Sequence, residues 1–437
     1  MASPSTLRVA LLGCGVVGTQ VVRLLKEQDA DLSARVGAKL ELIGIAVRDK
    51  SVTRDPIVDP ALLTEDAYGL IENADLVVEV MGGIDPARSL ILHAFEHGAS
   101  VVTANKALLA KRGTELYEAA QLKGVDIIYE AAVAGAIPII RQMRESLVGD
   151  RIERVLGIVN GTTNYILDQM TVADLDFETA LKQAQDLGYA EADPTADVEG
   201  HDAAAKAAIL ASLAFHTRVH LDDVSCQGIT EVSFEDVKWA KNSGYVIKLL
   251  AICELTEQGI SARVHPTLVP NSHPLSGVHG AFNAVFVQAK EAGELMFYGQ
   301  GAGGAPTASA VVGDLASLAR NRVLGGRSPI ESAYAKLDFA PFDSAQTRYQ
   351  IRLQVLDQPG VLAAVSGVFG QHSVSIETVR QIPKIKSLNA EGKESELAQL
   401  IITTHKATEA ALARIVAEVA ELEVVPAIKS VLRVEGA

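Results

Sequence analysis

The densest collection of ionisable residues lies between positions 188 and 206, and its spacing indicates proton-transfer chemistry. Asp202 and Lys206 are four residues apart, so a helix would place both side chains on one face. The segment continues almost wholly apolar to Phe215, which predicts a buried helix with the pair at its end in a cleft. A partly desolvated lysine beside a carboxylate can donate a proton or stabilise an oxyanion near neutral pH. An exposed pair would only stabilise the helix.

A second lysine, Lys106, follows a short apolar run that ends at Thr103. If that run is a strand of a parallel sheet, Lys106 lies just outside its carboxyl end. Ligands of such sheets bind there, so Lys106 is placed for substrate or cofactor. A surface lysine at the start of a helix is the alternative interpretation.

Gly13, Gly15 and Gly18 form a G-x-G-x-x-G pattern between an apolar run and a helical segment. The first glycine permits a tight turn, the second lets a pyrophosphate approach the backbone, and the third allows close helix–strand packing. The helix N-terminus supplies free amide donors for the anion. The pattern predicts a dinucleotide cofactor; a purely structural turn is the alternative. Further cofactor contacts are expected from Val16, Val17, Ala46, Lys106, Gly188 and Gly303.

The end of the second predicted strand carries a clue to cofactor preference. NAD-specific proteins usually place a carboxylate there, whereas this chain has Arg48, followed by Asp49 and Lys50. Arg48, helped by Lys50, could neutralise a 2′-phosphate and favour NADP over NAD. Asp49 could instead hold a ribose hydroxyl, and Arg48 could be a solvated surface charge.

Alternating apolar runs and helical segments predict a Rossmann-type, doubly wound parallel α/β sheet in residues 1–136. The expected strands are 7–12, 40–47, 76–80, 100–103 and 125–129, and the expected helices 17–28, 86–96 and 106–123. A glycine-dense turn precedes an apolar helix that would return the chain to this domain at about 303–324. Residues 137–302 have a mixed α+β texture and are expected to bind substrate and form a dimer contact. Helices are expected there at 137–147, 177–187 and 202–215, and strands at 152–159, 248–255 and 283–289. A linker at 325–347 leads to a βαββαβ unit at 348–437.

Composition limits the remaining possibilities. The 437 residues correspond to about three domains. A net charge of −15 argues against a nucleic-acid or anionic-membrane surface, and no apolar run is long enough to span a bilayer. Cys14, Cys226 and Cys253 lack ligand spacing, so we expect neither a disulfide framework nor a zinc site, and a cytoplasmic location.

Several of these motifs resemble those of one family. Residues 184–206, AQDLGYAEADPTADVEGHDAAAK, resemble the signature of homoserine dehydrogenase. The runs NGTTNYIL at 160–167, TANK at 103–106 and EAAVAGAIP at 130–138 resemble other hallmarks of that family. The resemblance covers about residues 7–324 and implies reversible NAD(P)H-dependent reduction of L-aspartate 4-semialdehyde to L-homoserine, in threonine and methionine biosynthesis.

The resemblance also implies roles for individual residues. Lys206 would donate the proton to the developing alkoxide, with Lys106 near nicotinamide and substrate. The carboxylates of Glu191 and Asp202 would hold the substrate ammonium, with Asp197 in support. Thr162 would contact the substrate. A monovalent cation, typically Na⁺, would bind the backbone carbonyls of Glu130, Val133, Gly135 and Ile137.

The C-terminal unit has a resemblance of its own. Residues 353–369, with the turn DQPG at 357–360, look like the opening of an ACT domain. This implies an amino-acid effector, L-threonine in this family, bound near that turn at an interface between paired domains. A module used only for assembly is the alternative. By the same analogy we expect a homodimer or homotetramer, and deletion from about residue 347 should preserve activity and abolish threonine sensitivity.

Two rival hypotheses make different demands on the sequence. A dehydrogenase that phosphorylates or acylates its aldehyde needs a nucleophilic cysteine, but Cys14 lies in the cofactor turn and the other cysteines in no motif. A catalytically silent sensor on a dehydrogenase scaffold would have lost its lysines and carboxylates. Lys106, Lys206, Glu191 and Asp202 are all present.

Overall fold

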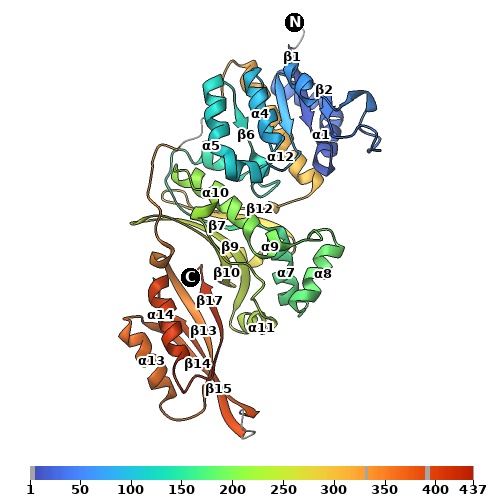
Figure 1. Cartoon of the computed structure of the whole chain (residues 1–437). Helices are drawn as coiled ribbons and strands as arrows, with labels where there is room; N and C mark the ends of the chain where they lie inside the picture. Colours follow the sequence, from blue (N-terminus) through green and yellow to red (C-terminus); the bar gives the residue numbers. More distant parts are fainter. Residues whose placement is uncertain (1–4, 330–332, 389–393, 437) are drawn as a thin grey trace.

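The computed structural model describes residues 5–329, 333–388 and 394–436. Figure 1 shows three parts in a row, with the N-terminal sheet at one end and the C-terminal unit at the other. The middle part carries α10 (His201–Phe215) beneath the first sheet. The sequence therefore folds into a chain of neighbouring parts whose contacts decide where the functional side chains meet.

The first part is built on a six-stranded parallel sheet in the order β3-β2-β1-β4-β5-β6. Its strands are β1 (Ser5–Leu12), β2 (Ala38–Ala46), β3 (Leu63–Thr64), β4 (Leu76–Glu79), β5 (Ser100–Thr103) and β6 (Ile127–Ile128). The order reverses at β1, so a crevice for a ligand opens at the carboxyl ends of β1 and β4. This arrangement confirms the predicted doubly wound sheet, although β6 is shorter than the predicted strand.

Helices cover both faces of this sheet because its strands are apolar on both sides. The helices are α1 (Val16–Glu27), α2 (Asp29–Val36), α3 (Ala67–Glu72), α4 (Ala87–Glu96), α5 (Lys106–Lys123) and α12 (Gly304–Val323). Val9 and Leu11 pack with α1, α2 and α12, whereas Ala10 and Leu12 pack with α4 and α5. Helix α12 thus returns to lie beside α1, as Figure 1 shows.

The middle part packs helices against antiparallel strands. Its strands are β7 (Ile152–Ile158), β9 (Tyr245–Thr256), β10 (Gly259–Pro270), β11 (Phe282–Ala289) and β12 (Gly293–Gln300). Its helices include α6 (Ile139–Arg141), α7 (Gly161–Val172), α8 (Phe177–Asp186), α9 (Thr195–Val198), α10 and α11 (Phe234–Asn242). The helix expected at 137–147 is instead the short α6 followed by a π-helical turn. Helices α7 and α11 and strands β10 and β12 were not predicted.

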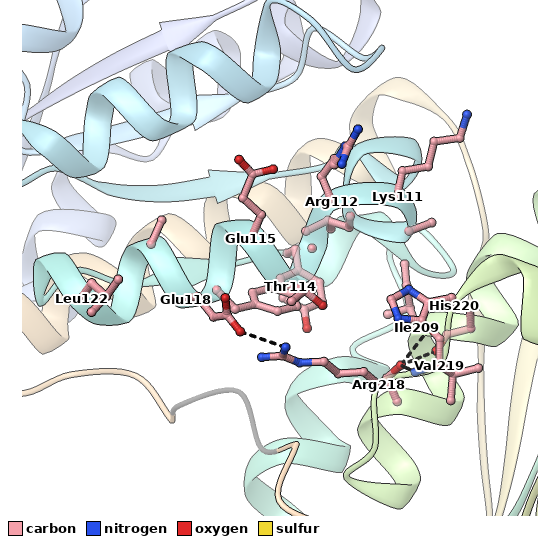
Figure 2. Close-up of a pocket in the computed structure, with 18 residues that line it drawn as sticks. Lys111, Arg112, Thr114, Glu115, Glu118, Leu122, Ile209, Arg218, Val219 and His220 are labelled. Carbon is pink, nitrogen blue, oxygen red and sulfur yellow. Dashed lines mark hydrogen bonds and ion pairs between the residues drawn. The ribbon is translucent and has the colours of Figure 1, made fainter. Parts of the chain in front are cut away.

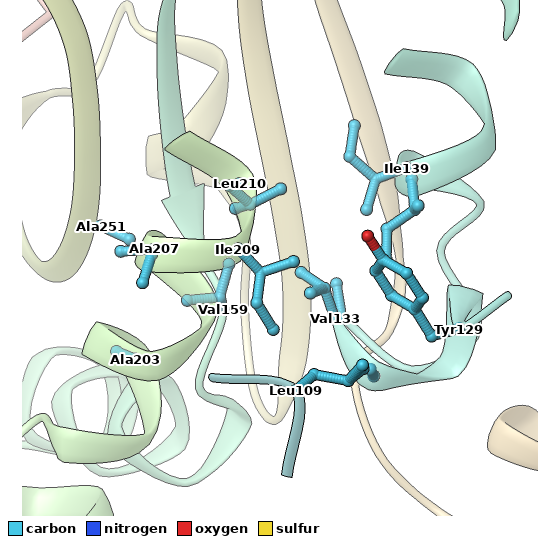
Figure 3. Packing of buried hydrophobic residues seen from close by; sticks show 14 of the residues in the cluster. Leu109, Tyr129, Val133, Ile139, Val159, Ala203, Ala207, Ile209, Leu210 and Ala251 are labelled. Atoms are coloured by element: carbon cyan, nitrogen blue, oxygen red, sulfur yellow. The ribbon is translucent and has the colours of Figure 1, made fainter. Parts of the chain in front are cut away.

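Helix α10 is the buried helix that the sequence predicted. Small alanines let it approach its neighbours closely, and its side chains are buried on nearly all sides. Figure 3 shows Ala203, Ala207 and Leu210 packed among Val159 and Ala251. A helix enclosed in this way holds Asp202 and Lys206 in fixed positions at its N-terminal end.

The C-terminal part has the predicted βαββαβ order. Its elements are β13 (Gln346–Leu356), α13 (Val361–Gln371), β14 (Ile376–Leu388), β15 (Glu394–Thr404), the short β16 (Ala407–Thr408), α14 (Glu409–Ala420) and β17 (Ala427–Val434). Strand β17 pairs with β13 on one side and, in parallel, with β10 of the middle part on the other. The two sheets therefore merge into one 11-stranded sheet.

Buried ion pairs reinforce this junction. Glu435 binds Arg154 and also Arg263, whose Nη2 lies 3.1 Å from Glu435 Oε1. Arg352 of β13 donates to Asp236 of α11 over 2.6 Å, and both side chains are buried. The C-terminal part is thus joined to the middle part by backbone pairing and by charge, not by the linker alone.

None of the helices in the described part of the chain is both long enough and apolar enough to cross a bilayer.

Candidate active site

Asp202 lies between the two lysines that the sequence singled out. One carboxylate oxygen contacts Lys206 Nζ at 2.7 Å, and the other forms an ion pair with Lys106 Nζ. Lys106 is the first residue of α5, and Asp202 and Lys206 lie in α10. The ion pair between Lys106 and Asp202 therefore joins the first part of the molecule to the middle part. The structure thus brings together three residues that are up to 100 positions apart in sequence.

Lys206 is buried, whereas Lys106 is about half exposed, with side-chain exposures of 9% and 48%. Lys206 Nζ also donates to the carbonyl oxygen of Val159 at 2.6 Å. Burial and the charge of Lys106 lower the pKa of Lys206, whereas the charge of Asp202 raises it. The net effect is a lowered pKa. Burial would raise the pKa of Asp202, but the two ammonium groups prevail and hold it well below its usual range. The site is therefore a fixed carboxylate with two cations.

The Asn160 side chain links the carboxylates of Asp197 and Asp202. Its Nδ2 donates to Asp202 Oδ2 at 2.9 Å and to Asp197 Oδ1 at 2.7 Å. Its Oδ1 accepts from Thr163 N, so the same side chain caps the N-terminus of α7. The sequence analysis quoted Asn160 only within a motif and gave it no role. Its partners lie 37 and 42 residues away, which no local spacing could indicate.

The other predicted substrate residues differ in how they relate to this centre. Thr162 is buried at the start of α7 and donates its hydroxyl to the Tyr189 carbonyl at 2.7 Å. Glu191 follows in the same loop, and its carbonyl accepts from Gln185. Its exposed carboxylate has no hydrogen bond or ion pair within the described part of the chain. Asp197 and Asp202 thus form one cluster through Asn160, whereas Glu191 lies on an exposed loop and is not bound to it.

The glycine turn has the geometry that a pyrophosphate requires. Gly13 has φ +100°, and a Cβ there would lie 3.0 Å from the Val80 carbonyl oxygen. A Cβ on Gly18 would lie 2.3 Å from the Gly13 carbonyl oxygen, whereas one on Gly15 would meet no atom within 4 Å. Gly15 is the residue preceding α1, so open space lies before the free amides of that helix.

The other predicted cofactor residues lie around this turn or beyond it. Val16 and Val17 begin α1, and Ala46 ends β2, whose carbonyl accepts from Gly13 N. A Cβ on Gly304 would lie 2.7 Å from Val16 Cγ1, so the Gly303 turn approaches the glycine turn closely. Gly188 lies just after α8, in the loop that also contains Glu191, with φ +75°.

A buried carboxylate that the sequence analysis missed organises the strand ends near Lys106. Glu79, the last residue of β4, accepts from Met81 N at 2.8 Å and from the Thr103 hydroxyl. Burial raises its pKa despite these donors. Asn105 caps α5 and donates to the Gly83 carbonyl at 2.7 Å. A glutamate ending an otherwise apolar strand is the signal that could have revealed it.

Arg48 is exposed at the end of β2 and has no hydrogen-bond partner in the described part of the chain. Asp49 instead accepts from the Ser51 amide and hydroxyl at 2.8 and 2.6 Å. These hydrogen bonds lower the pKa of Asp49 and engage one of its carboxylate oxygens, Oδ1. Arg48 is thus wholly available to a ligand, and Asp49 only in part.

The predicted cation loop is buried and tightly turned. Ala134 and Gly135 have φ of +57° and +58°. Within the described part of the chain, no residue donates a hydrogen bond to the carbonyl oxygens of Val133 and Gly135. The Ile137 carbonyl accepts from Ile139 N at 2.9 Å, and the Glu130 carbonyl accepts from Val133 N at 3.4 Å. Carbonyl oxygens that lack donors in a buried turn fit a hard monovalent cation.

The Glu130 side chain belongs to a separate buried cluster. Its carboxylate accepts from the amides of Ile140 and Arg141, and its own amide donates to Asp314 of α12 at 2.7 Å. Burial and the nearby charge of Asp314 raise the pKa of Glu130 to about 7. This cluster ties the cation loop to α12.

A cleft of about 450 Å³ separates α5 and α10 beyond the lysine pair (Figure 2). Glu118 of α5 and Arg218, just after α10, form an ion pair of 2.9 Å across it. Neither Lys106 nor Lys206 lines this cleft. The two lysine-bearing helices are therefore linked at their N-terminal ends by Asp202 and farther along by this surface ion pair.

The cysteines do not support the acylating alternative. Cys253 is buried, and burial raises its pKa to about 12. Burial also raises the pKa of Cys226, whose thiol donates to the Glu199 carbonyl at 3.3 Å. Neither is a ready thiolate at neutral pH.

Comparisons with known proteins match the chain from end to end. Family models described as homoserine dehydrogenase, its NAD binding domain and the ACT domain match residues 138–316, 13–130 and 349–424. Homoserine dehydrogenase of Corynebacterium glutamicum is 53% identical over 438 residues, covering 99% of this chain and 96% of the relative. The crystal structure of a homoserine dehydrogenase from Thiobacillus denitrificans has a TM-score of 0.90 and 37% identity, covering 99% of each chain. A hyperthermophilic archaeal homoserine dehydrogenase in complex with NADPH has a TM-score of 0.62 and 26% identity, covering 74% of this chain and 99% of that one.

The matched segments include the glycine turn, both lysines and the carboxylates that join them. The identity to the Corynebacterium enzyme is high and spans nearly the whole length of both proteins. The chain therefore belongs to the homoserine dehydrogenase family, with an ACT domain at its C-terminal end.

Proposed function

We propose that Lys206 donates the proton to the carbonyl oxygen when L-aspartate 4-semialdehyde is reversibly reduced to L-homoserine. The observation that carries this role is the buried Lys206 ammonium, held by Asp202 and the Val159 carbonyl. NAD(P)H, when bound, supplies the hydride to the carbonyl carbon. An ammonium group in a largely water-excluded site stabilises the alkoxide as it forms and then neutralises it.

Lys106 occupies the more open side of the same carboxylate. Its partial exposure supports a role at the mouth of the site, where a second cation would face nicotinamide and substrate. The substrate ammonium needs carboxylates, for which we assign Glu191 and Asp202, with Asp197 in support. Thr162 contacts the substrate through its hydroxyl. Exposed Glu191, without a partner in the described part of the chain, is available for this ion pair.

The glycine turn binds the cofactor, and Arg48 favours NADP. Arg48 is exposed and available, whereas Ser51 engages one carboxylate oxygen of Asp49. The archaeal relative bound to NADPH agrees with this preference. Val16, Val17, Ala46, Gly188 and Gly303 complete the contacts in this proposal.

The carbonyls of Glu130, Val133, Gly135 and Ile137 would hold Na⁺ in a structural role. The left-handed turn at Gly135 and the two carbonyls without described donors support the site. The cation would fix the loop between β6 and α6, and no step of the reaction passes through it.

The ACT domain would bind L-threonine near the turn at 357–360 and regulate a cytoplasmic homodimer or homotetramer. The domain match supports an amino-acid effector, and the three free cysteines accord with a reducing compartment. Cofactor oxidation with aspartate semialdehyde, using NADH and NADPH in parallel and with and without threonine, tests cofactor preference and effector together.

Replacing the proposed proton donor should separate chemistry from binding. Lys206→Ala should lower kcat by about 10²–10⁴-fold, because general acid catalysis contributes that much. The Kd for NADPH should stay nearly unchanged, since Lys206 contacts Asp202 and Val159, not the glycine turn. Steady-state kinetics and fluorescence titration of NADPH measure the two quantities.

Lys182→Ala is the matched control, because Lys182 forms an exposed i,i+4 pair with Asp186 on α8. It should retain full activity. Equal losses of turnover and cofactor affinity in Lys206→Ala would show that the lysine has a structural role or binds the cofactor.

A further inference from the structure

Two histidines and a glutamate gather on the surface of the first part, away from the lysine pair. His93 and His97 are four residues apart at the end of α4, and Glu72 ends α3. One potential ligand atom from each of the three residues lies within 4.8 Å of the other two. In the described part of the chain, this is the one such group of histidine, cysteine or acidic side chains.

Existing contacts orient both imidazole rings. His97 Nδ1 lies 2.9 Å from the His93 carbonyl oxygen, so it carries the proton and donates, which leaves Nε2 unprotonated. The rings are 4.2 Å apart between centroids, and the Tyr68 ring packs edge-on against His93. The two rings are thus held side by side on one helix face.

His93 Nε2 is buried and lacks a hydrogen-bond partner in the described part of the chain. It lies 3.6 Å from Glu72 Oε1, too far for a hydrogen bond. A buried polar nitrogen without a partner costs free energy. A ligand between Nε2 and the carboxylate would remove that cost.

We propose that His93, His97 and Glu72 form a binding site for a divalent transition metal ion such as Zn²⁺. Two imidazole nitrogens and one carboxylate oxygen are ligands that Zn²⁺ accepts, with water completing a tetrahedron. Ligand atoms around tetrahedral zinc lie roughly 3.3 Å apart, given metal–ligand distances near 2.0 Å. The observed upper limit of 4.8 Å reaches that spacing through small side-chain rotations.

The position of the site indicates a structural role. His97 lies three residues before the start of β5, whereas Lys106 lies three residues after the end of the same strand. The four residues of β5 separate the two edges of the sheet by roughly 13 Å. A metal ion would tie α3 to α4 without entering the reaction, so this site is independent of the proposed function.

The three cysteines lack ligand spacing, so the sequence predicted no zinc site. The i,i+4 histidine pair was present in the sequence. Its third ligand, however, comes from another helix 21 positions earlier.

The test uses the full-length protein after treatment with EDTA and gel filtration. Titration with Zn²⁺ by calorimetry should show one site that His97→Gln and Glu72→Gln each weaken by about tenfold or more, since even outer-shell partners change metal affinity by that much. Cu²⁺, used as a spectroscopic probe, should give an EPR spectrum with coupling to two nitrogens, reduced to one in His97→Gln. Saturating Zn²⁺ should raise the Tm of the wild type by a few degrees and that of the variants less.

His372→Gln is the matched control. His372 forms a 2.8 Å pair with Glu418, and no third ligand lies within reach in the described part of the chain. This variant should keep the wild-type affinity and spectrum. Unchanged zinc affinity in both site variants, or a copper spectrum without nitrogen coupling, would overturn the proposal. Dehydrogenase activity should remain at the wild-type level in His97→Gln, whatever the outcome for Lys206.

Discussion

At the scale of single residues, Asp202 controls the protonation of Lys206. Burial and the nearby Lys106 charge lower the pKa of Lys206, and Asp202 opposes both effects. The Lys206 ammonium therefore loses its proton at a lower pH than an ordinary lysine. In the proposed mechanism reduction of the aldehyde requires that proton, so its rate should fall as pH rises through this lowered pKa.

Asp202→Asn should move this alkaline limb to lower pH, in addition to lowering kcat. The reason is that the variant leaves Lys206 facing the positive charge of Lys106 without a compensating carboxylate. The kcat of the reductive reaction between pH 6 and 10 measures the shift. Asp193→Asn, on an exposed carboxylate bound to Thr195, should leave the limb in place. An Asp202→Asn profile that parallels the wild type would exclude Lys206 as the titrating acid.

Arg48→Ala should raise the KM for NADPH about tenfold and leave that for NADH nearly unchanged. The expected size is that of one charge-assisted hydrogen bond to a phosphate at an exposed position. Arg35→Ala, on the exposed Arg35–Asp31 pair of α2, is the control and should change neither value. If the ratio of the two KM values is unaltered, Arg48 does not read the 2′-phosphate.

At the scale of elements, two glycines of the same turn should have different roles: Gly18 in stability and Gly15 in cofactor binding. Gly18→Ala should destabilise the first part by about 1–3 kcal/mol, because the new methyl would press on the Gly13 carbonyl. Gly15→Ala should leave the Tm unchanged, since its φ of −86° suits alanine and its Cβ meets open space. That methyl would stand where the pyrophosphate approaches, so NADPH affinity should fall at least tenfold.

Thermal melting and NADPH titration of both variants check this division. A Gly15→Ala variant that melts like Gly18→Ala, or one that binds NADPH normally, would contradict it.

The elements that could be predicted are those whose sequence pattern is local. The alternation around β1 to β5 and the alanine-rich α10 follow from periodicity and composition, and the glycine turn from its spacing. Helix α7 was missed because its first turn, Gly161-Thr162-Thr163, has the composition of a loop and depends on the Asn160 cap. Strand β12 was likewise missed, because much of it is exposed and polar.

The site could be predicted in part for the same reason. Motif spacing placed Asp202 beside Lys206, but only tertiary packing brings Lys106 and Asn160 to the same carboxylate. The buried Glu79 and the Glu130–Asp314 cluster depend on contacts between segments far apart in sequence. The position of Glu79 at the end of an apolar strand is a local signal, but its partner Thr103 and the Glu130–Asp314 contact could not be predicted from one segment.

At the scale of the whole molecule, Glu435 is the charge on which the junction of the two sheets depends. Burial would raise its pKa, but Arg154 and Arg263 lower it below its usual value. Its contribution to stability is therefore present above its unfolded pKa and lost as pH falls through the folded pKa.

Glu435→Gln should cost about 3 kcal/mol at pH 7, because it leaves two buried guanidinium groups undercompensated. The free energy of unfolding of the variant should also fall less steeply at acidic pH, because the variant has no Glu435 carboxylate to protonate. Thermal melting at pH 4 to 8 measures both effects, and Glu377→Gln on a surface ion pair with Arg348 is the control. A wild-type melting profile would mean that the junction does not depend on this charge.

The pairing of β17 with β10 also changes what the C-terminal part can do. Deletion from residue 347, expected from sequence to preserve activity and abolish threonine sensitivity, would strip β10 of a neighbouring strand and Arg263 of its partner Glu435. In the intact chain, β17 pairs with β10 through two residues of each strand. An effector that moved the ACT domain would have to move β10 with it or break this pairing, so we expect the response to be switch-like rather than graded.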